Sequence, residues 1–414
     1  MASNNNKDKC NVPHLRFPEF SEEWEICKVS ELLDFYSTNS LSWEQLEYGT
    51  KAMMNLHYGL IHVGLPTMVD LTRDNLPNIK EDNMPKNFEL CKEGDVAFAD
   101  ASEDTNEVAK PIEFFDLAGK NIVCGLHTIH GRDNKNKTVI GFKGYAFSSS
   151  AFHNQIRRIA QGTKIYSIST KNFSECFIGI PSKVEQTKIA TLLRLIDERI
   201  ITQNKIIEDL KKLKSAIIDY AINSLDTDFA KFGSLYETAG EGGTPTTSNA
   251  SFYDNGKIPF VKIDDLKQKY LTENKDFITE LGLQKSSAWL VPTRSILFSN
   301  GATIGEITIT TYPVCTKQGI LGIVPKSNID VEFLYYFMSS TYFKKAISRI
   351  VTEGTMKTAY LKDIANILCP IPTKEKQQGI AKMPSALNSK IDYEQSLLKL
   401  FIMQKQYLLR QMFI

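Results

Sequence analysis

Histidine and cysteine, the side chains best suited to catalysis or metal binding, are spaced in a way that argues against both. All six histidines lie in the first half of the 414-residue chain. His57 and His62, or His127 and His130, are near enough in sequence to suggest paired ligands, but neither pair has cysteines at a zinc-site spacing. We therefore expect no histidine catalysis and no metal site.

The seven cysteines form no Cys-x-x-Cys pair, and their odd number does not suit a disulfide framework. They are typical of reduced, mostly buried thiols. The first residues contain no apolar signal-peptide core, and the chain has no run of 18 apolar residues. These features predict a soluble cytoplasmic protein without a membrane span.

The sequence motifs of several enzyme classes are absent. The chain has no Gly-x-x-x-x-Gly-Lys-[Ser/Thr] phosphate loop, no Gly-x-Gly-x-x-Gly turn, no His-Glu-x-x-His and no Gly-x-Ser-x-Gly. It also lacks the Asn-Pro-Pro-Tyr or Asp-Pro-Pro-Tyr string of DNA amino-methylating enzymes. The acidic clusters at 102–104 and 264–265 suit turns and helix caps better than an acid–base pair. We expect no active site on this chain.

The charges balance, with 49 Lys and Arg against 48 Asp and Glu. A nucleic-acid contact would therefore have to come from local basic clusters. With 42% apolar and 23% charged residues the chain can fold throughout, and its length suits two or three domains.

The elements that must position any site occur twice. A shift of 191 residues aligns Phe152, Ile156, Arg158 and Ile159 with Phe343, Ile347, Arg349 and Ile350. The same shift aligns Pro181, Gln186, Ile189 and Ala190 with Pro372, Gln377, Ile380 and Ala381. Ordered matches of this kind indicate two diverged copies of one unit.

Each copy ends in a predicted long helix with apolar residues at heptad spacing. A 40-residue helix spans about 60 Å, which exceeds what its own domain needs and favours a two-helix coil over packing on that domain. The predicted seam residues are Ile196, Ile200, Gln203, Ile207, Leu210, Lys214 and Ile217 in the first helix and Leu387, Ile391, Glu394, Leu398, Phe401, Lys405 and Leu408 in the second.

Polar residues interrupt both predicted seams at equivalent places. The shift aligns Gln203 with Glu394 and Lys214 with Lys405. Because polar seam residues fix register and partner, we expect the two helices to pair with each other. Pro384 predicts that the regular part of the second helix begins near Ser385.

About 150 residues of short β-like runs punctuated by Gly, Asn and Pro precede each helix. The predicted fold class is α+β, with two globular domains joined by two long antiparallel coiled-coil helices as a pseudo-two-fold internal repeat. The predicted segments are 1–180, 181–225, 226–371 and 372–414.

Long ordered strings carry a family resemblance. They are LRFPEFSEEWE at 15–25, GGTPTTSNASFYDNGKIPFVKIDDL at 242–266, LVPTRSILFSNGATIGEITIT at 290–310 and CTKQGILGIVPKS at 315–327. Over nearly its whole length the chain resembles the DNA-specificity (S) subunit of Type I restriction–modification systems. The first half lacks the GGTP opening, and such divergence suits two domains that read different sequences.

The resemblance implies a non-catalytic subunit that reads a bipartite, asymmetric DNA target. Residues 1–180 and 226–371 would be target-recognition domains 1 and 2, and 181–225 and 372–414 the central and C-terminal conserved helical regions, whose coil sets the spacer. The implied partners are double-stranded DNA, two modification (methyltransferase) subunits and restriction/translocase subunits. S-adenosylmethionine, ATP and Mg would be bound by those subunits in a bacterial or archaeal cytoplasm, and no cofactor by this chain.

On this interpretation the local basic clusters and two amides become candidate DNA contacts. Arg158 and Arg349 rank first for phosphate because they occupy the same place in the two copies, while Gln318 and Asn300 could read adenine. The other candidates are Arg132, Lys135, Lys137, Arg157, Lys262, Lys267, Lys317, Lys344, Lys345 and Lys357.

Two other functions remain open from the sequence. A protein-binding scaffold is compatible with the balanced charge, and a stand-alone nuclease would act on the same DNA without partners. The outward apolar residues Ile206, Leu213 and Leu400 suit either partner docking or coil packing.

Overall fold

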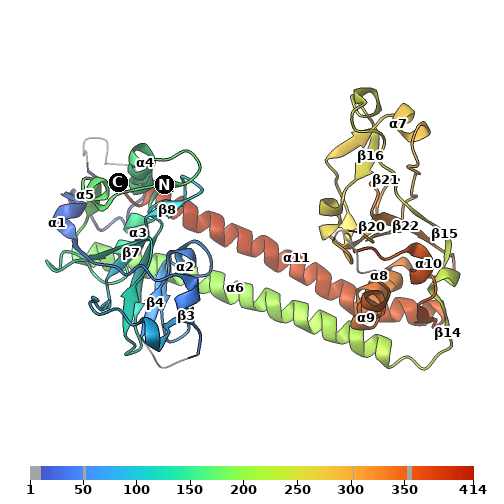
Figure 1. Ribbon diagram of the computed structural model, residues 1–414, viewed down its shortest axis with the longest axis horizontal. Coiled ribbons are helices and arrows are strands. Elements are labelled where there is room, and N and C mark those ends of the chain that lie inside the picture. Colours follow the sequence, from blue (N-terminus) through green and yellow to red (C-terminus); the bar gives the residue numbers. More distant parts are fainter. Residues whose placement is uncertain (1–10, 50–52, 302, 352–356) are drawn as a thin grey trace. The chain divides into compact units, whose positions relative to one another are not determined.

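The computed structural model describes residues 11–49, 53–301, 303–351 and 357–414. They form two compact units, Met1–Asn204 with Leu397–Ile414, and Lys205–Ser396. Each unit combines a globular part with about half of each long helix, α6 (Lys183–Asn223) and α11 (Lys374–Gln411), as Figure 1 shows. The four segments predicted from the sequence stay a prediction, because these units divide both helices.

The first unit is built around a five-stranded mixed sheet of order β2-β11-β7-β9-β5. Its strands are β2 (Asp34–Tyr36), β11 (Thr128–Arg132), β7 (Val96–Ala99), β9 (Pro111–Asp116) and β5 (Met68–Asp70). A four-stranded sheet contains β10 (Ile122–Cys124), β4 (Met54–Leu56), β6 (Asn78–Ile79) and β3 (Leu46–Glu47). Two separate two-stranded sheets complete the first unit. They pair β1 (Glu25–Lys28) with β13 (Phe177–Ile180), and β8 (Ala101–Ser102) with β12 (Tyr166–Ser167).

Short helices cover the first unit's sheets. They are α1 (Val29–Leu32), α2 (Tyr58–His62), α3 (Lys143–Phe147), α4 (Ser150–Ile159) and α5 (Thr170–Ser174). Phe152 at the start of α4 packs against Phe147 and Phe173 in the apolar core. The ring of Phe98 from β7 joins the same cluster, so the helix is fixed directly to the central sheet.

The second unit repeats this plan with a five-stranded sheet of order β15-β22-β19-β20-β17. The strands are β15 (Tyr236–Glu241), β22 (Ile320–Pro325), β19 (Ile296–Ser299), β20 (Ile307–Thr310) and β17 (Tyr270–Leu271). Beside it lie the sheet of β18 (Asp276–Ile278), β16 (Ile258–Val261) and β21 (Cys315–Thr316), and the pair β14 (Phe229–Lys231) with β23 (Leu368–Pro370).

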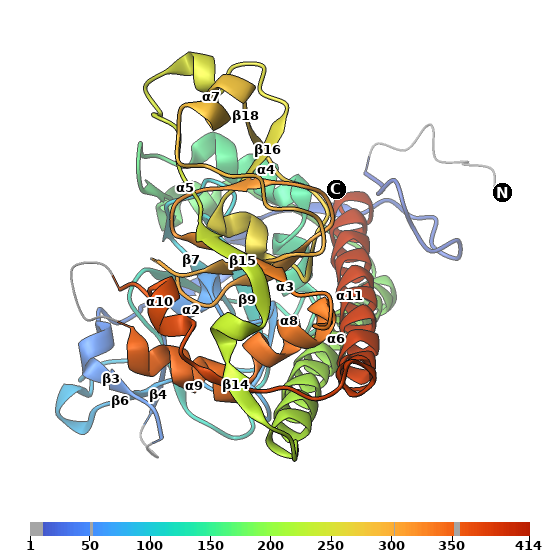
Figure 2. The same cartoon turned by 90° about the vertical axis from the view of Figure 1, so that its right-hand side faces the viewer.

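The helices of the second unit separate into two groups in Figure 2. At one end α7 lies beside β16 and β18, and at the other α9 and α10 lie near β14. Their bounds are α7 (Glu280–Gln284), α8 (Val331–Ser339), α9 (Thr341–Ile350) and α10 (Leu361–Ile364). Phe343 at the start of α9 packs against Phe298 and Phe337, as Phe152 packs in the first unit.

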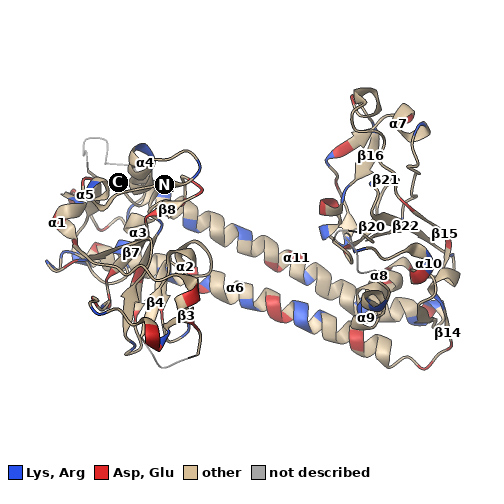
Figure 3. Cartoon of the chain, in the orientation of Figure 1, with Lys and Arg blue, Asp and Glu red and all other residues tan. Residues whose placement is uncertain are grey.

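All fourteen predicted seam residues are buried or half-buried, whereas residues between them such as Thr202, Lys211 and Lys399 are exposed. This is the pattern of two amphipathic helices packed along one face. Acidic and basic residues alternate along α6 outside that face (Figure 3).

The helix α11 begins at Lys374 and continues through Pro384, so the predicted start near Ser385 is wrong. A proline inside a helix removes one backbone hydrogen bond, here to the carbonyl of Ile380, and strains the preceding turn. Pro384 is buried, and its packing within the second unit outweighs that local cost. Local propensity alone does not set this helix boundary.

Two polar seam positions make equivalent contacts, one in each unit. Lys405 Nζ lies 2.6 Å from Asp197 Oδ1, and Lys214 Nζ donates to Asn388 Oδ1 at 2.9 Å. The 191-residue shift that aligns the two lysines also aligns Asp197 with Asn388. These contacts specify one register for the α6–α11 pairing within each unit.

Among the helices of the described residues, none combines the length and apolarity needed to cross a membrane.

Candidate nucleic-acid interface

In the second unit, buried Asn300 fixes two loops to the end of β19. Its N–H donates to the carbonyl of Gly319 at 3.0 Å, and its carbonyl accepts from the N–H of Ala359 at 2.9 Å. Its side-chain Nδ2 donates to the Ala359 carbonyl at 3.2 Å. We call residues 299–301, 317–319 and 357–359 the second-unit edge.

The glycine-rich string at 242–247 packs against the turn at 317–319 of this edge. A Cβ on Gly242 would lie 2.2 Å from the Thr316 carbonyl, so only glycine lets β15 continue past the turn. The Thr244 hydroxyl accepts from the N–H of Gln318 at 3.2 Å, and Glu241 accepts from the N–H of Gly319 at 3.0 Å. The motif residues therefore hold the turn from which the exposed side chain of Gln318 projects.

The first unit has the same backbone arrangement. The N–H of Asp100 donates to the His127 carbonyl at 3.0 Å, and the Asp100 carbonyl accepts from the N–H of Ile168 at 2.9 Å. His127 and Gly319 both have positive φ, 55° and 90°. We call residues 100–102, 125–127 and 166–168 the first-unit edge.

The side chains of the two edges differ although the frameworks agree. The exposed imidazole of His127 lies 3.1 Å from Asp100 Oδ1, where the second edge has Gly319 and the amide of Asn300. Burial raises the pKa of Asp100, and the nearby His127 opposes the shift. The polar groups offered to a ligand are consequently different in the two units.

Exposed basic side chains follow equivalent helices. Ser149 and Ser340 cap α4 and α9 by accepting from the N–H of Phe152 and Phe343, each at 3.2 Å. The apolar faces of these helices are buried, while the opposite faces expose Arg157 and Arg158 on α4 and Lys344, Lys345 and Arg349 on α9. Arg157 already donates to Asn106 Oδ1 at 3.2 Å and to Asn154.

Several other predicted basic contacts are engaged in exposed pairs. Lys137 pairs with Glu25 at 2.7 Å, Lys262 with Asp276 at 2.8 Å and Lys267 with Asp264 at 2.8 Å, and Lys135 donates to the Glu31 carbonyl at 2.7 Å. Exposed pairs of this kind contribute about 0–1 kcal/mol. They can exchange their partner for a phosphate at little cost. Lys317 and Lys357 are exposed at the second-unit edge.

Two predicted contacts lie inside the protein. Arg132 is 7% exposed, and its guanidinium donates to Asp95 at 2.8 Å, Glu89 at 2.6 Å and the Leu90 carbonyl at 2.7 Å. Asn300 is 2% exposed and holds the loops described above. Because both are buried, neither is placed to reach a base or phosphate. Sequence spacing does not reveal which polar residues are buried, so it could not exclude them.

His127 lies at the first-unit edge but is not among the DNA contacts predicted from the sequence. The alignment of Val123-Cys124 with Val314-Cys315 contains the signal, since it places residues 125–127 opposite the turn of Gln318. A search for clusters of lysine and arginine does not find His127.

The expectation that no histidine has cysteine partners is contradicted. Cys91, Cys124 and His130 place their ligand atoms within 4.8 Å of one another, and all three are buried. The sequence spacing hid this group because Cys91 lies in the segment before β7, 33 residues from Cys124 of β10 and 39 from His130 of β11. The six described cysteines are all buried and free.

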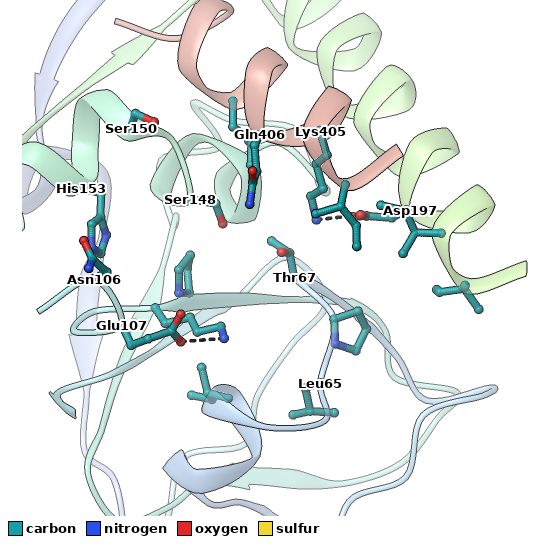
Figure 4. Close-up of a pocket in the computed structure, with 18 of the residues that line it drawn as sticks. Leu65, Thr67, Asn106, Glu107, Ser148, Ser150, His153, Asp197, Lys405 and Gln406 are labelled. Carbon is teal, nitrogen blue, oxygen red and sulfur yellow. Dashed lines mark ion pairs between the residues drawn. The ribbon is translucent and has the colours of Figure 1, made fainter. Parts of the chain in front are cut away.

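A cavity of about 690 Å³ in the first unit lies between the loop at Leu65–Thr67 and the helices α6 and α11. Figure 4 shows Lys405 directed at Asp197, and Glu107 paired with a neighbouring lysine. Tyr145 also donates to Asp197, at 2.8 Å. Because Lys405, Asp197 and Glu107 already have partners, we interpret the cavity as a packing gap beside the helices and not as a ligand site.

Comparison with known proteins identifies relatives for this arrangement. Residues 226–400 match the family model described as type I restriction modification DNA specificity domain. The putative type I restriction enzyme MjaX specificity subunit of Methanocaldococcus jannaschii is 23% identical over 403 residues, covering 92% of this chain and 91% of that protein. Residues 226–400 therefore match the DNA specificity domain of type I systems, and the chain is similar over nearly its whole length to a type I specificity subunit.

Other relatives match over shorter spans. The MjaIX specificity subunit of the same organism is 31% identical over 173 residues, which cover 40% of this chain and only 39% of that protein's length. The type I restriction enzyme EcoR124I/EcoR124II specificity subunit of Escherichia coli is 25% identical over 34% of this chain and 36% of its own.

Solved structures share the specificity-subunit fold. The type I S subunit from M. genitalium has a TM-score of 0.54 and 18% identity, covering 97% of this chain and 99% of that one. A chain from a type I restriction–modification assembly has a TM-score of 0.60 and 15% identity, covering 93% and 96%. The predicted α+β class with two long paired helices is confirmed.

Proposed function

We propose that this chain is the non-catalytic DNA-recognition subunit of a type I restriction–modification complex. Each globular part would read one half of a bipartite, asymmetric target. The observation that carries the proposal is the pair of edges, in which one backbone framework presents different side chains. A scaffold that binds protein gives no reason for conserving the framework while changing the polar groups on it.

The second-unit edge suits base recognition in a major groove. Gln318 is exposed on a turn whose backbone is fixed by Asn300 and Thr244, and a glutamine amide can pair with adenine N6 and N7. At the first-unit edge the exposed polar side chain is His127, which lies at the position of Gly319, next to that of Gln318. A fixed backbone reduces the entropy lost on binding, so the side chain can discriminate between bases.

The helices α4 and α9 would supply phosphate contacts. Arg158 and Arg349 remain the leading candidates because they are exposed at equivalent positions, with Arg157, Lys344 and Lys345 beside them. The paired residues Lys135, Lys137, Lys262 and Lys267, together with Lys317 and Lys357, would add secondary contacts. Arg132 and Asn300 have structural roles and leave the proposed set.

The long helices would set the spacer and hold partner subunits. Ile206, Leu213 and Leu400 are 39%, 47% and 59% exposed, and their apolar surface is available for docking. We propose two modification subunits, which would bring S-adenosylmethionine, and restriction/translocase subunits, which would use ATP and Mg, in a bacterial or archaeal cytoplasm. On this proposal residues 1–180 and 226–371 are the recognition domains.

Selection of duplexes from a random library tests the assignment of the edges. The probe is the complex of this chain with its modification subunits. We expect Gln318→Ala to relax preference at one half-site, by about 1–3 kcal/mol for one base pair, and His127→Ala to affect the other half-site only. Lys399→Ala, on the exposed face of α11, is the control.

Two results would count against the proposal. Unchanged half-sites in both edge variants would remove the edges from recognition. DNA binding independent of salt would favour the scaffold, since phosphate contacts release counterions.

A further inference from the structure

We propose that the first unit binds one thiolate-preferring transition metal ion, of the Zn²⁺ class, between Cys91, Cys124 and His130. Among the residues that the structure describes, this is the one group of three or more metal-ligating side chains whose ligand atoms lie within 4.8 Å of one another. The exposed fractions are 5%, 1% and 0%.

The distance between the two sulfurs suits a shared metal. The Sγ atoms of Cys91 and Cys124 lie 3.6 Å apart. Two thiolates at about 2.3 Å from a tetrahedral zinc are separated by about 3.8 Å. Metal binding therefore needs little movement of either cysteine.

The backbone disfavours a disulfide between the same cysteines. Leu90 pairs with Val123 in an antiparallel bridge, and the N–H of Cys91 donates to the Ile122 carbonyl at 2.9 Å. Cys91 and Cys124 are therefore diagonal neighbours on one face, a relation in which Cα atoms lie about 7–8 Å apart. A disulfide spans at most about 6.8 Å between Cα atoms.

The two nitrogens of the His130 imidazole differ in their hydrogen bonding. Its Nε2 lies 2.8 Å from Asp95 Oδ2, and that carboxylate is held in turn by Arg132. This bond places a proton on Nε2, so in the neutral imidazole the lone pair lies on Nδ1. Nδ1 is buried, and no group among the described residues forms a hydrogen bond with it. A buried nitrogen without a partner is costly, and a metal ion would supply the missing partner.

The ligand set selects the class of ion. Two thiolates and one imidazole prefer zinc or other soft ions over Mg²⁺ or Ca²⁺. Two thiolates also neutralise a divalent ion, so the buried site gains no net charge. The ion would join the segment before β7 to β10 and β11, and thereby restrain the turn at 125–127 that follows Cys124.

The second unit supplies an internal control. Its bridge of Val291 with Val314 places Pro292 and Cys315 where the first unit has Cys91 and Cys124. Strand pairing of Ala97 with His130 and of Leu297 with Gly322 places glycine at the histidine position. Cys315 is therefore a buried cysteine in the same local fold without the other two ligands.

Cobalt binding to the chelator-treated full chain tests the proposal. We expect one equivalent of Co²⁺ per chain, with a thiolate-to-cobalt charge-transfer band that Zn²⁺ abolishes. Cys124→Ser and His130→Gln should lose the band, while Cys315→Ser should keep it. Asp95→Asn should weaken affinity by about 10–100-fold, as expected for a residue that orients a ligand. Absence of the band in the unmodified chain, or its survival in Cys124→Ser, overturns the proposal.

A measurement without substitutions covers the case in which a variant fails to fold. Zn²⁺ should slow alkylation of Cys91 and Cys124 in the unmodified chain and leave the rate at Cys315 unchanged. Equal rates with and without Zn²⁺ at all three cysteines contradict the site. A Cys91–Cys124 disulfide in the chelator-treated chain that forms equally fast with Zn²⁺ present contradicts it too.

Discussion

At the scale of single residues, burial separates two kinds of basic side chain that look alike in the sequence. Arg132 is locked between Asp95 and Glu89, whereas Arg158 is exposed on α4. Net charge and local clustering could not distinguish them, because the carboxylates that engage Arg132 lie 37 and 43 positions away. The proposed DNA contacts therefore follow exposure in the structure.

The two arginines should respond oppositely to alanine substitution. Arg132→Ala leaves the buried Asp95 carboxylate with His130 as its remaining side-chain partner and should lower the free energy of unfolding by about 3 kcal/mol or more. Arg158→Ala should change it by less than about 0.5 kcal/mol but reduce the slope of log affinity against log salt by about 1. Urea unfolding and salt-dependent DNA binding measure the two effects. A stable Arg132→Ala variant with weakened DNA binding would reverse the assignment.

At the scale of elements, the repeat and the heptad spacing were sufficient to predict both long helices and their pairing. The start of α11 was not predictable, because buried Pro384 is held by tertiary contacts that local propensity omits. The turns of the two edges could not be predicted to lie beside the ends of β19 and β7, because that proximity depends on which strands pair and in which register. Likewise, Cys91, Cys124 and His130 meet only once β10 and β11 are in place.

The polar seam lysines should differ in what they contribute. Lys405→Met leaves the largely buried Asp197 without its cation and should destabilise the first unit by about 2 kcal/mol or more. Lys214→Met removes a half-buried lysine whose pKa is lowered by burial and whose seam contact is the neutral Asn388. Removing that desolvation penalty offsets the lost hydrogen bond. The free energy of unfolding of the Lys214→Met variant should therefore change by less than about 1 kcal/mol. Thermal and urea unfolding compare the pair, and equal losses would contradict the distinction.

At the scale of the whole molecule, we propose that helix length determines the spacer. The helices α6 and α11 are 41 and 38 residues long. Adding four residues to each extends a helix by about 6 Å, against about 3.4 Å per base pair. We expect the preferred spacer to lengthen by about 1–2 base pairs, with both half-sites unchanged. Selection from libraries of duplexes with different spacer lengths measures this preference. An unchanged spacer would contradict the proposed role of helix length.

On the proposed function, this chain alone determines a bipartite DNA target. The most direct measurement maps methylated positions across plasmid DNA after co-expression with a cognate modification subunit. We expect two short half-sites at fixed separation that vanish without this chain, and a single changed half-site when one globular part is exchanged. Methylation without a bipartite motif, or methylation unaffected by this chain, would contradict it.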